Sequence, residues 1–234
     1  MDKLIIVMPV YNEEENIQNV INDWYPVVEK IGNGSKIIIV NDGSTDNTEK
    51  ILSENALLKK QLYFVTKPNS GHGPSVTYAY KMALKENPDY IFQIDSDGQV
   101  LVSDFERFWK HRNDYDAIIG YRKNRQDGFG RIIVTKTLKA LIRVVFGCTV
   151  TDANTPFRLM HTDVLKKYID KIPDDYNLPN VILSTMFVKN KENVKFAKIT
   201  FKPRAAGVNK LNVKKIFKIG LKSIKDFYNF KKII

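Results

Sequence analysis

The first half of the chain repeats one pattern: a short apolar run, a turn with polar residues, and then a stretch with helical spacing. The apolar runs are rich in Ile, Val, Phe and Tyr, as the buried strands of a parallel sheet are. They are Lys3–Met8, Lys36–Val40, Gln61–Val65, Tyr90–Ile94 and Ala117–Ile119. The helical stretches between them are Glu13–Ile31, Thr45–Leu58 and Ser75–Leu84. This alternation predicts an α/β fold with a mostly parallel, doubly wound sheet flanked by helices.

The length of 234 residues suits one α/β domain, expected over residues 1–211, with a short appendage over residues 212–234. Met1 leads directly into an apolar run, so we expect a first strand there rather than a signal peptide. No apolar stretch approaches the roughly 20 residues that cross a bilayer. The single cysteine, Cys148, excludes an intramolecular disulfide. We therefore expect a cytoplasmic protein, either free or peripheral at the inner face of the membrane.

The net charge of +11 is concentrated in the last part of the chain. From Arg204 to Ile234 there are nine lysines or arginines and one acid, so this segment carries +8. Because the rest is nearly balanced, we do not expect nucleic acid as the partner. Apolar residues recur there at helical spacing, with lysines between them: Val213, Phe217, Leu221, Ile224, Phe227 and Tyr228. Such a basic amphipathic helix can lie on an anionic membrane. Alternatively, it packs on the domain and leaves its lysines in solvent.

Polar residues follow four of the predicted strands. In a doubly wound sheet, ligands bind where the carboxyl ends of the strands turn into helices. The clusters at those points are Tyr11–Glu14, Asn41–Ser44, Lys67–Gly73 and Asp95–Gln99. The sequence therefore predicts one ligand site formed by four loops.

The fourth cluster carries two carboxylates, Asp95 and Asp97, separated by one residue and followed by Gly98 and Gln99. Carboxylate and amide oxygens suit Mg²⁺ or Mn²⁺, and a cation with few protein ligands can be completed by substrate phosphates. An Asx turn that closes a strand is the alternative explanation of the same residues.

Two other loops suit a nucleotide. Asp42 stands at a strand end, too early to cap the next helix, and it can accept hydrogen bonds from a base or a ribose; Thr45 or Asp46 can cap that helix. Gly71 precedes a helix expected to open at Pro74, so backbone amides there can approach phosphate. For the loop after the second strand, a plain turn and cap is the alternative.

Arginines follow the fifth strand, at Arg122, Arg125 and Arg131. Guanidinium groups bind phosphate oxygens in pairs, so this loop is a candidate anion site, and a solvated basic loop is the alternative. Further along, Asp152 can orient or deprotonate an acceptor, or it can pair with Arg158.

Taken in order, these segments resemble glycosyltransferase family 2. The resemblance covers residues 3 to 211 and is strongest to the branch with dolichyl-phosphate mannosyltransferase and the polyprenyl-phosphate sugar transferases. The segments that carry it are Pro9–Glu14, Asn41–Asp46, Asp95–Gln99, Gly120–Arg131, Asp152–Arg158, and Arg204 with Gly207 and Lys210.

This resemblance implies a GT-A fold, a nucleoside-diphosphate sugar donor and inversion at the anomeric carbon. It assigns the donor to Pro9, Tyr11, Glu13, Asp42, Gly71 and Asp95, and the Mg²⁺ or Mn²⁺ to Asp95, Asp97 and Gln99. It implies catalytic roles for Asp97, Asp152, Arg122 and Arg131. It assigns the acceptor phosphate or the departing diphosphate to Arg122, Arg125, Arg131, Arg204 and Lys210.

Two departures from that branch concern the acceptor. Where relatives often have a proline-containing loop after the carboxylates, this chain has Val100–Val102, and it has no apolar run of membrane-spanning length after the catalytic part. The sequence predicts an inverting, metal-dependent hexosyltransferase that acts on a polyprenyl-phosphate or other lipid-linked acceptor. Its donor would be a UDP-sugar, with GDP-mannose possible. Transfer to a glycan hydroxyl in capsule or cell-wall synthesis is the alternative, followed by a non-catalytic nucleotide- or nucleic-acid-binding protein.

Overall fold

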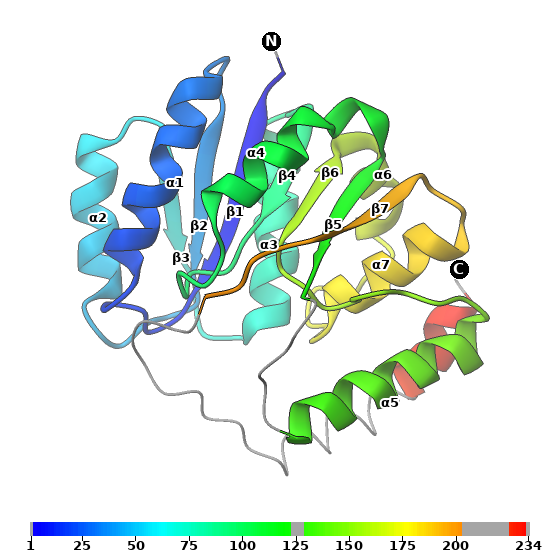
Figure 1. The fold of residues 1–234 in the computed structure, drawn as a ribbon. Coiled ribbons are helices and arrows are strands. Elements are labelled where there is room, and N and C mark those ends of the chain that lie inside the picture. Colours follow the sequence, from blue (N-terminus) through cyan, green and yellow to red (C-terminus); the bar gives the residue numbers. More distant parts are fainter. Residues whose placement is uncertain (1, 123–128, 203–224, 233–234) are drawn as a thin grey trace.

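A seven-stranded sheet forms the centre of the computed structural model, which describes residues 2–122, 129–202 and 225–232 (Figure 1). The strand order is β3-β2-β1-β4-β6-β5-β7. The strands are β1 (Leu4–Val10), β2 (Lys36–Asn41), β3 (Leu62–Thr66), β4 (Tyr90–Gln93), β5 (Ala117–Tyr121), β6 (Arg158–His161) and β7 (Val194–Lys198). Strand β6 runs antiparallel to β4 and β5, whereas the other neighbours are parallel. The mostly parallel sheet predicted from the sequence is confirmed.

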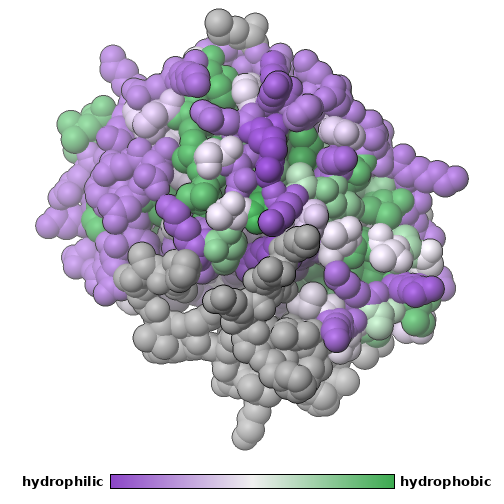
Figure 2. Space-filling view, in the orientation of Figure 1, coloured by the Kyte–Doolittle hydropathy of each residue, from purple (hydrophilic) through white to green (hydrophobic). Residues whose placement is uncertain are grey.

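Helices cover both faces of this sheet. They are α1 (Ile17–Ile31), α2 (Thr48–Leu58), α3 (His72–Lys85), α4 (Val102–Lys110), α5 (Phe129–Phe146), α6 (Thr162–Ile169) and α7 (Pro179–Lys189), with the short 3₁₀ helix η1 (Arg112–Asp114) and a helix over residues 225–231. Helices α1, α2 and α4 pack on the near face in Figure 1, and their outer surface is mostly hydrophilic (Figure 2). The other long helices pack on the far face.

Strand β1 explains why the sheet needs two helical layers. All seven of its residues are buried, because side chains alternate between the two faces of a strand and both faces are covered. Leu4 and Ile6 face the layer that contains Trp24 of α1, and Ile5 and Val7 face the layer that contains Tyr80 of α3. The apolar run at the start of the chain is therefore the central strand.

The structure differs from the predicted elements in two strands and several helix starts. Strands β6 and β7 were not predicted. Helix α1 begins at Ile17 instead of Glu13, because residues 11–16 form turns that contact the loop after β2. Helix α3 begins at His72, before the expected Pro74, directly after Gly71, whose φ of 97° a helix does not allow.

The described part of the tail packs on the domain. Within the helix over residues 225–231, Phe227 is 0% exposed and contacts Phe146 at 5.5 Å between ring centroids, and Phe230 contacts Tyr176 at 4.9 Å. Tyr228, on the same helix, is 51% exposed. For these turns the packing alternative holds; residues 212–224 of the predicted amphipathic helix lie outside the described residues. Among the described helices, none combines the length and apolar character needed to cross a bilayer.

Candidate functional site

The loops after β1 and β2 are joined into one wall at the carboxyl edge of the sheet. The side-chain oxygen of Asn12 accepts a hydrogen bond from the Thr45 amide at 2.8 Å, and the Asn12 amide donates to Ser44 Oγ at 3.0 Å. The Glu13 amide donates to Thr48 Oγ1 at 2.9 Å. These polar residues therefore hold the two predicted nucleotide loops against each other through bonds within the chain, without a ligand.

The same wall contains the start of α2. Asp46 accepts hydrogen bonds from the Thr48 amide at 3.0 Å and the Glu14 amide at 3.2 Å, while the Glu14 carboxylate accepts the Asn47 amide at 2.9 Å. Of the two predicted caps, Asp46 satisfies the first helical amide and Thr45 does not. On this wall Pro9 is buried within β1 and the Tyr11 side chain is half exposed, as a ring that stacks on a ligand needs to be.

Asp42 organises the third loop. Its carboxylate is 3% exposed and accepts hydrogen bonds from the backbone amides of Ser70 at 2.9 Å and Gly71 at 2.8 Å, and it forms an ion pair with Lys67. Burial would raise the pKa of Asp42, but these hydrogen bonds outweigh it and the pKa lies below its usual value. The sequence pointed to Asp42 as a ligand contact; the structure adds that it shapes the loop that leads into α3. Lys67 was missed as an individual residue, although it follows a strand end as the other candidates do.

The carboxylate segment follows β4 at the same edge. Asp97 Oδ1 accepts the Gln99 amide at 3.1 Å and Gly98 has a φ of 69°, so the Asx-type turn predicted as an alternative is present. Asp95 Oδ1 is buried and has no hydrogen-bond partner among the described residues, and His72 Nε2 lies 3.8 Å from it. An acceptor oxygen left open beside a second carboxylate fits a divalent cation.

The described residues contain no group of three or more His, Cys, Asp or Glu side chains that could hold a metal unaided. A cation at Asp95 and Asp97 would therefore need further oxygens, from Gln99 or from a bound phosphate. The Gln99 side-chain nitrogen donates to the Lys202 carbonyl at 3.0 Å, and the Lys202 amide donates back to the Gln99 carbonyl at 2.8 Å. This pairing brings the chain after β7 to the carboxylate segment, and the side-chain oxygen of Gln99 is the atom that a metal would bind.

The basic residues are only partly described. The Arg122 guanidinium, at the end of β5, lies 3.5 Å from the ring centroid of Phe201, next to Lys202. The structure thus brings Arg122 to the segment that pairs with the carboxylate loop. The predicted residues Arg125, Arg204 and Lys210 lie outside the described residues, as does the side chain of Arg131, whose backbone begins α5.

Asp152 is buried in the segment that leads into β6. The direct pairing with Arg158 that the sequence allowed is not formed, because the Arg158 guanidinium donates to the carbonyls of Ala153, Thr155 and Asn180 and to Ser184 Oγ. The sequence named Arg158 only as a partner of Asp152, and its hydrogen bonds to these carbonyls and to Ser184 were not predicted.

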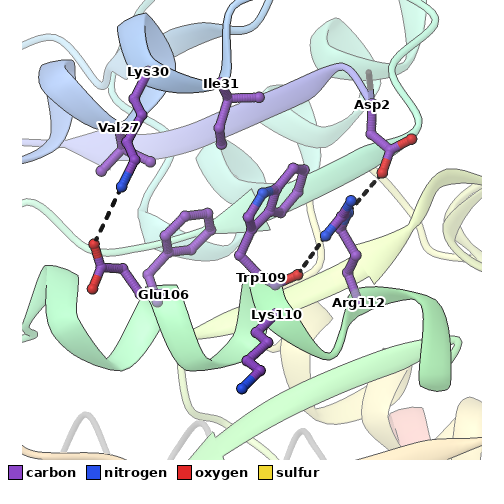
Figure 3. A pocket seen from close by; sticks show the side chains of 9 residues that line it. Asp2, Val27, Lys30, Ile31, Glu106, Trp109, Lys110 and Arg112 are labelled. Carbon is purple, nitrogen blue, oxygen red and sulfur yellow. Dashed lines mark hydrogen bonds and ion pairs between the residues drawn. The ribbon is translucent and has the colours of Figure 1, made fainter.

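A cavity of about 500 Å³ lies at the opposite edge of the sheet, between α1 and α4 (Figure 3). Four of its five charged side chains form ion pairs with one another: Arg112 binds Asp2 at 2.6 Å, and Lys30 lies 3.9 Å from Glu106. Ligands of open α/β sheets bind at the carboxyl edge, where the polar clusters lie. The cavity is therefore not the candidate site.

Comparison with known proteins agrees with this geometry. The model of the family described as glycosyl transferase family 2 matches residues 5–169. The chain belongs to glycosyl transferase family 2. The matched region contains the four loops, the carboxylate segment, Arg122, Asp152 and Arg158, so the resemblance predicted from the sequence is confirmed.

Among its relatives is an undecaprenyl-phosphate 4-deoxy-4-formamido-L-arabinose transferase of Pectobacterium atrosepticum, 30% identical over 150 residues. That match covers 63% of this chain and 45% of the relative, so the chain spans about half the length of the curated relatives it matches. An uncharacterized protein of Methanocaldococcus jannaschii is 29% identical over 237 residues, 96% of this chain and 99% of that protein.

Solved structures with the same fold include glucosyl-3-phosphoglycerate synthase from Mycobacterium tuberculosis in complex with phosphoglyceric acid. Its TM-score is 0.70 at 17% identity, over 98% of this chain and 80% of that one. The same enzyme has been solved with Mn²⁺ and UDP-glucose, with a TM-score of 0.68 at 17% identity, over 95% of this chain and 77% of that one. This family 2 chain therefore has the GT-A fold that the resemblance implied.

Proposed function

We propose that this chain is an inverting, metal-dependent glycosyltransferase that moves a sugar from a nucleoside-diphosphate sugar to a polyprenyl-phosphate or other lipid-linked acceptor. The observation that carries the proposal is the convergence of four strand-end loops on a carboxylate pair, in which the buried Asp95 Oδ1 has no hydrogen-bond partner among the described residues. Membership of family 2 and the name of the Pectobacterium relative support the same activity.

The donor lies along the loops after β1, β2 and β3. Tyr11 offers an exposed ring for the base, and Pro9, Glu13 and Asp42 line the nucleotide side. Gly71 brings the amino end of α3, with its positive dipole end, toward the phosphates. A UDP-sugar is the favoured donor and GDP-mannose is the alternative.

Asp95, Asp97 and Gln99 would hold a Mg²⁺ or Mn²⁺ ion that offsets the negative charge growing on the departing diphosphate. The open oxygen of Asp95 fits this role, and Gln99 is held in place by Lys202. Mn²⁺ in a solved complex of the M. tuberculosis enzyme is consistent with it.

The acceptor side is formed by Arg122 and, from the sequence, by Arg125, Arg131, Arg204 and Lys210. A phosphate acceptor is ionised at neutral pH, so its oxygen attacks the anomeric carbon without a strong general base. A glycan hydroxyl needs a base, and the buried carboxylate of Asp152 favours this second candidate function, whereas toward a phosphate acceptor Asp152 would only orient the attacking group. Transfer assays to a short polyprenyl phosphate and to oligosaccharides separate the two acceptors.

The decisive experiment is a thermal-shift panel with UDP-glucose, UDP-galactose, UDP-N-acetylglucosamine and GDP-mannose, with and without Mn²⁺. We expect one donor to stabilise the chain only when Mn²⁺ is present, and Asp97→Ala to abolish that shift. Asp23→Asn, an exposed carboxylate on α1, is the matched control and should leave the shift unchanged. A donor shift that survives Asp97→Ala would overturn the metal assignment, and a salt-dependent affinity for nucleic acid with no donor effect would favour the non-catalytic alternative.

A peripheral position at the inner face of the membrane completes the proposal. The +8 charge from Arg204 onward supports it. Phe227 and Phe230 are buried in the domain, so the proposed contact with the membrane rests on the lysines of the tail. Replacing Lys214, Lys215, Lys218 and Lys222 by Gln should weaken binding to anionic liposomes by about 1,000-fold, since each lysine contributes about 1 kcal/mol at such a surface. The control replaces four lysines elsewhere: Lys50, Lys60, Lys85 and Lys110. Equal binding by both variants would contradict the membrane role of the tail.

A further inference from the structure

Arg158 is a buried arginine close to the carboxylate pair, and the function proposed above assigns it no role. Its side chain is 0% exposed. In the sheet it lies opposite Gln93 of β4, two residues before Asp95. A fully buried arginine is rare and costs free energy through the loss of hydration, so its presence at this position needs an explanation.

Every N–H direction of its guanidinium is used. Nε donates to the Thr155 carbonyl at 3.1 Å, and Nη2 donates to the same carbonyl at 2.7 Å and to that of Ala153 at 3.2 Å. Nη1 donates to the Asn180 carbonyl at 3.2 Å and to Ser184 Oγ at 3.3 Å. These five hydrogen bonds join the turn after Asp152 to the first half of α7. Lysine could not replace them, because an ammonium has three donors and no planar fork.

The charge of Arg158 acts on the candidate site. Burial lowers the pKa of Arg158, and the negative charges of Asp152 and Asp95 oppose that shift. Within the described part of the chain, no carboxylate reaches ion-pair distance of the guanidinium, whose partners are carbonyls and a hydroxyl. Asp152 and Asp95 therefore interact with Arg158 through their charges and not through a direct ion pair with it.

We propose that Arg158 is a positioning residue: its guanidinium holds the turn over residues 153–155 and thereby sets where the Asp152 carboxylate stands relative to the reacting groups. This inference rests on the proposed function, in which Asp152 orients or deprotonates the acceptor. A turn fixed by one planar group leaves that carboxylate little freedom, and a misplacement of about 1 Å is enough to slow an enzymatic step about 100-fold. Because Arg158 acts through Asp152, its loss lowers turnover and leaves donor binding intact.

The test is a double-variant cycle on Arg158→Lys and Asp152→Asn. The assay follows release of the nucleoside diphosphate from UDP-glucose, UDP-galactose and GDP-mannose with Mn²⁺, with and without a short-chain polyprenyl phosphate. Arg158→Lys should lower kcat about 10- to 100-fold and change the donor KM by less than about twofold. In the Asp152→Asn background the same substitution should change kcat by less than about twofold, since a residue that acts through Asp152 has nothing left to position.

A second pair of variants covers the case in which Arg158→Lys does not fold. Ser184→Ala removes one acceptor of the guanidinium, and Thr185→Val removes the neighbouring hydroxyl, which is buried and donates to the Val181 carbonyl at 2.7 Å. Ser184→Ala should lower kcat about threefold and Thr185→Val should leave it unchanged, because loss of one hydrogen bond to a charged group is a modest perturbation.

Three outcomes overturn the inference. Effects of Arg158→Lys and Asp152→Asn that multiply would assign Arg158 a purely structural role, and so would equal effects of Ser184→Ala and Thr185→Val. In either case the proposed function would stand, because the unmodified chain releases the nucleoside diphosphate. No release by the unmodified chain with any of the three donors would overturn the proposed function, and the positioning role with it.

Discussion

Asp42 and Lys67 form an ion pair whose loss should be measurable in the stability of the whole domain. Their side chains are 4% and 15% exposed, and the Asp42 carboxylate also accepts the amides of Ser70 and Gly71. In Asp42→Asn the amide nitrogen would face one of these backbone N–H groups, and Lys67 would lose its counter-ion. Breaking a buried pair by removing one partner costs about 3 to 5 kcal/mol. Because Lys67 keeps Ser70 Oγ and the Pro68 carbonyl as acceptors, we expect the lower end, about 3 kcal/mol of unfolding free energy.

The pH dependence of this loss follows from the depressed pKa of Asp42. A carboxylate whose pKa is lower in the folded than in the unfolded state stabilises the fold above the unfolded pKa of about 3.9, and this contribution is lost as the pH falls through the folded pKa. The difference in unfolding free energy between the unmodified chain and Asp42→Asn should therefore be constant from about pH 5 to 8 and shrink below about pH 4.

Urea unfolding followed by circular dichroism measures both effects. Asp116→Asn is the matched control, since Asp116 is half-buried and its Oδ2 accepts a backbone amide, that of Asn193, at 2.8 Å. It should cost about 1 kcal/mol. Adding Lys67→Met to Asp42→Asn should recover part of the loss, because no unpaired charge then remains buried. An Asp42→Asn variant that loses no more unfolding free energy than Asp116→Asn would refute the contribution of this ion pair. So would a double variant whose loss equals the sum of the separate losses of Asp42→Asn and Lys67→Met.

Three further changes test other parts of the fold. A Cβ at Gly73 would lie 2.5 Å from backbone atoms of Asn177, so Gly73→Ala should destabilise the chain by about 1 to 3 kcal/mol in thermal unfolding; an unchanged melting temperature would contradict this contact. Phe227→Ala should cost about 3 to 5 kcal/mol and Tyr228→Ala less than about 1 kcal/mol, and equal losses would show that the tail does not pack as described. Glycine tolerates the φ of 51° at position 12, so Asn12→Gly removes the side-chain bond to the loop after β2 without straining the backbone. It should weaken donor affinity in calorimetry and leave kcat unchanged. Unaltered affinity would contradict the role of these joined loops in donor binding.

Much of the fold could be predicted because its signals are local. A strand buried on both faces must be a continuous apolar run, as β1 and β2 are, and each run lies beside a helix with its own apolar stripe. Strands β6 and β7 were not predicted because neither is a continuous apolar run. Strand β6 begins with Arg158, and β7 contains two lysines among its five residues. Their pairing in the sheet, rather than their own composition, makes them strands.

The sequence by itself determined the alternation of strands and helices in the first half of the chain, the family, and the strand ends at which polar residues gather, because parallel strands bring their carboxyl ends to one edge whatever the loops contain. Tertiary structure alone decided what those residues do to one another. It paired Asp42 with Lys67, joined Gln99 to Lys202, and buried Arg158 away from any direct counter-ion within the described residues. These contacts join residues far apart in the chain, or depend on which of several possible acceptors the packed backbone presents. No local pattern encodes that choice, since it is set by how the crossovers bring separate segments together.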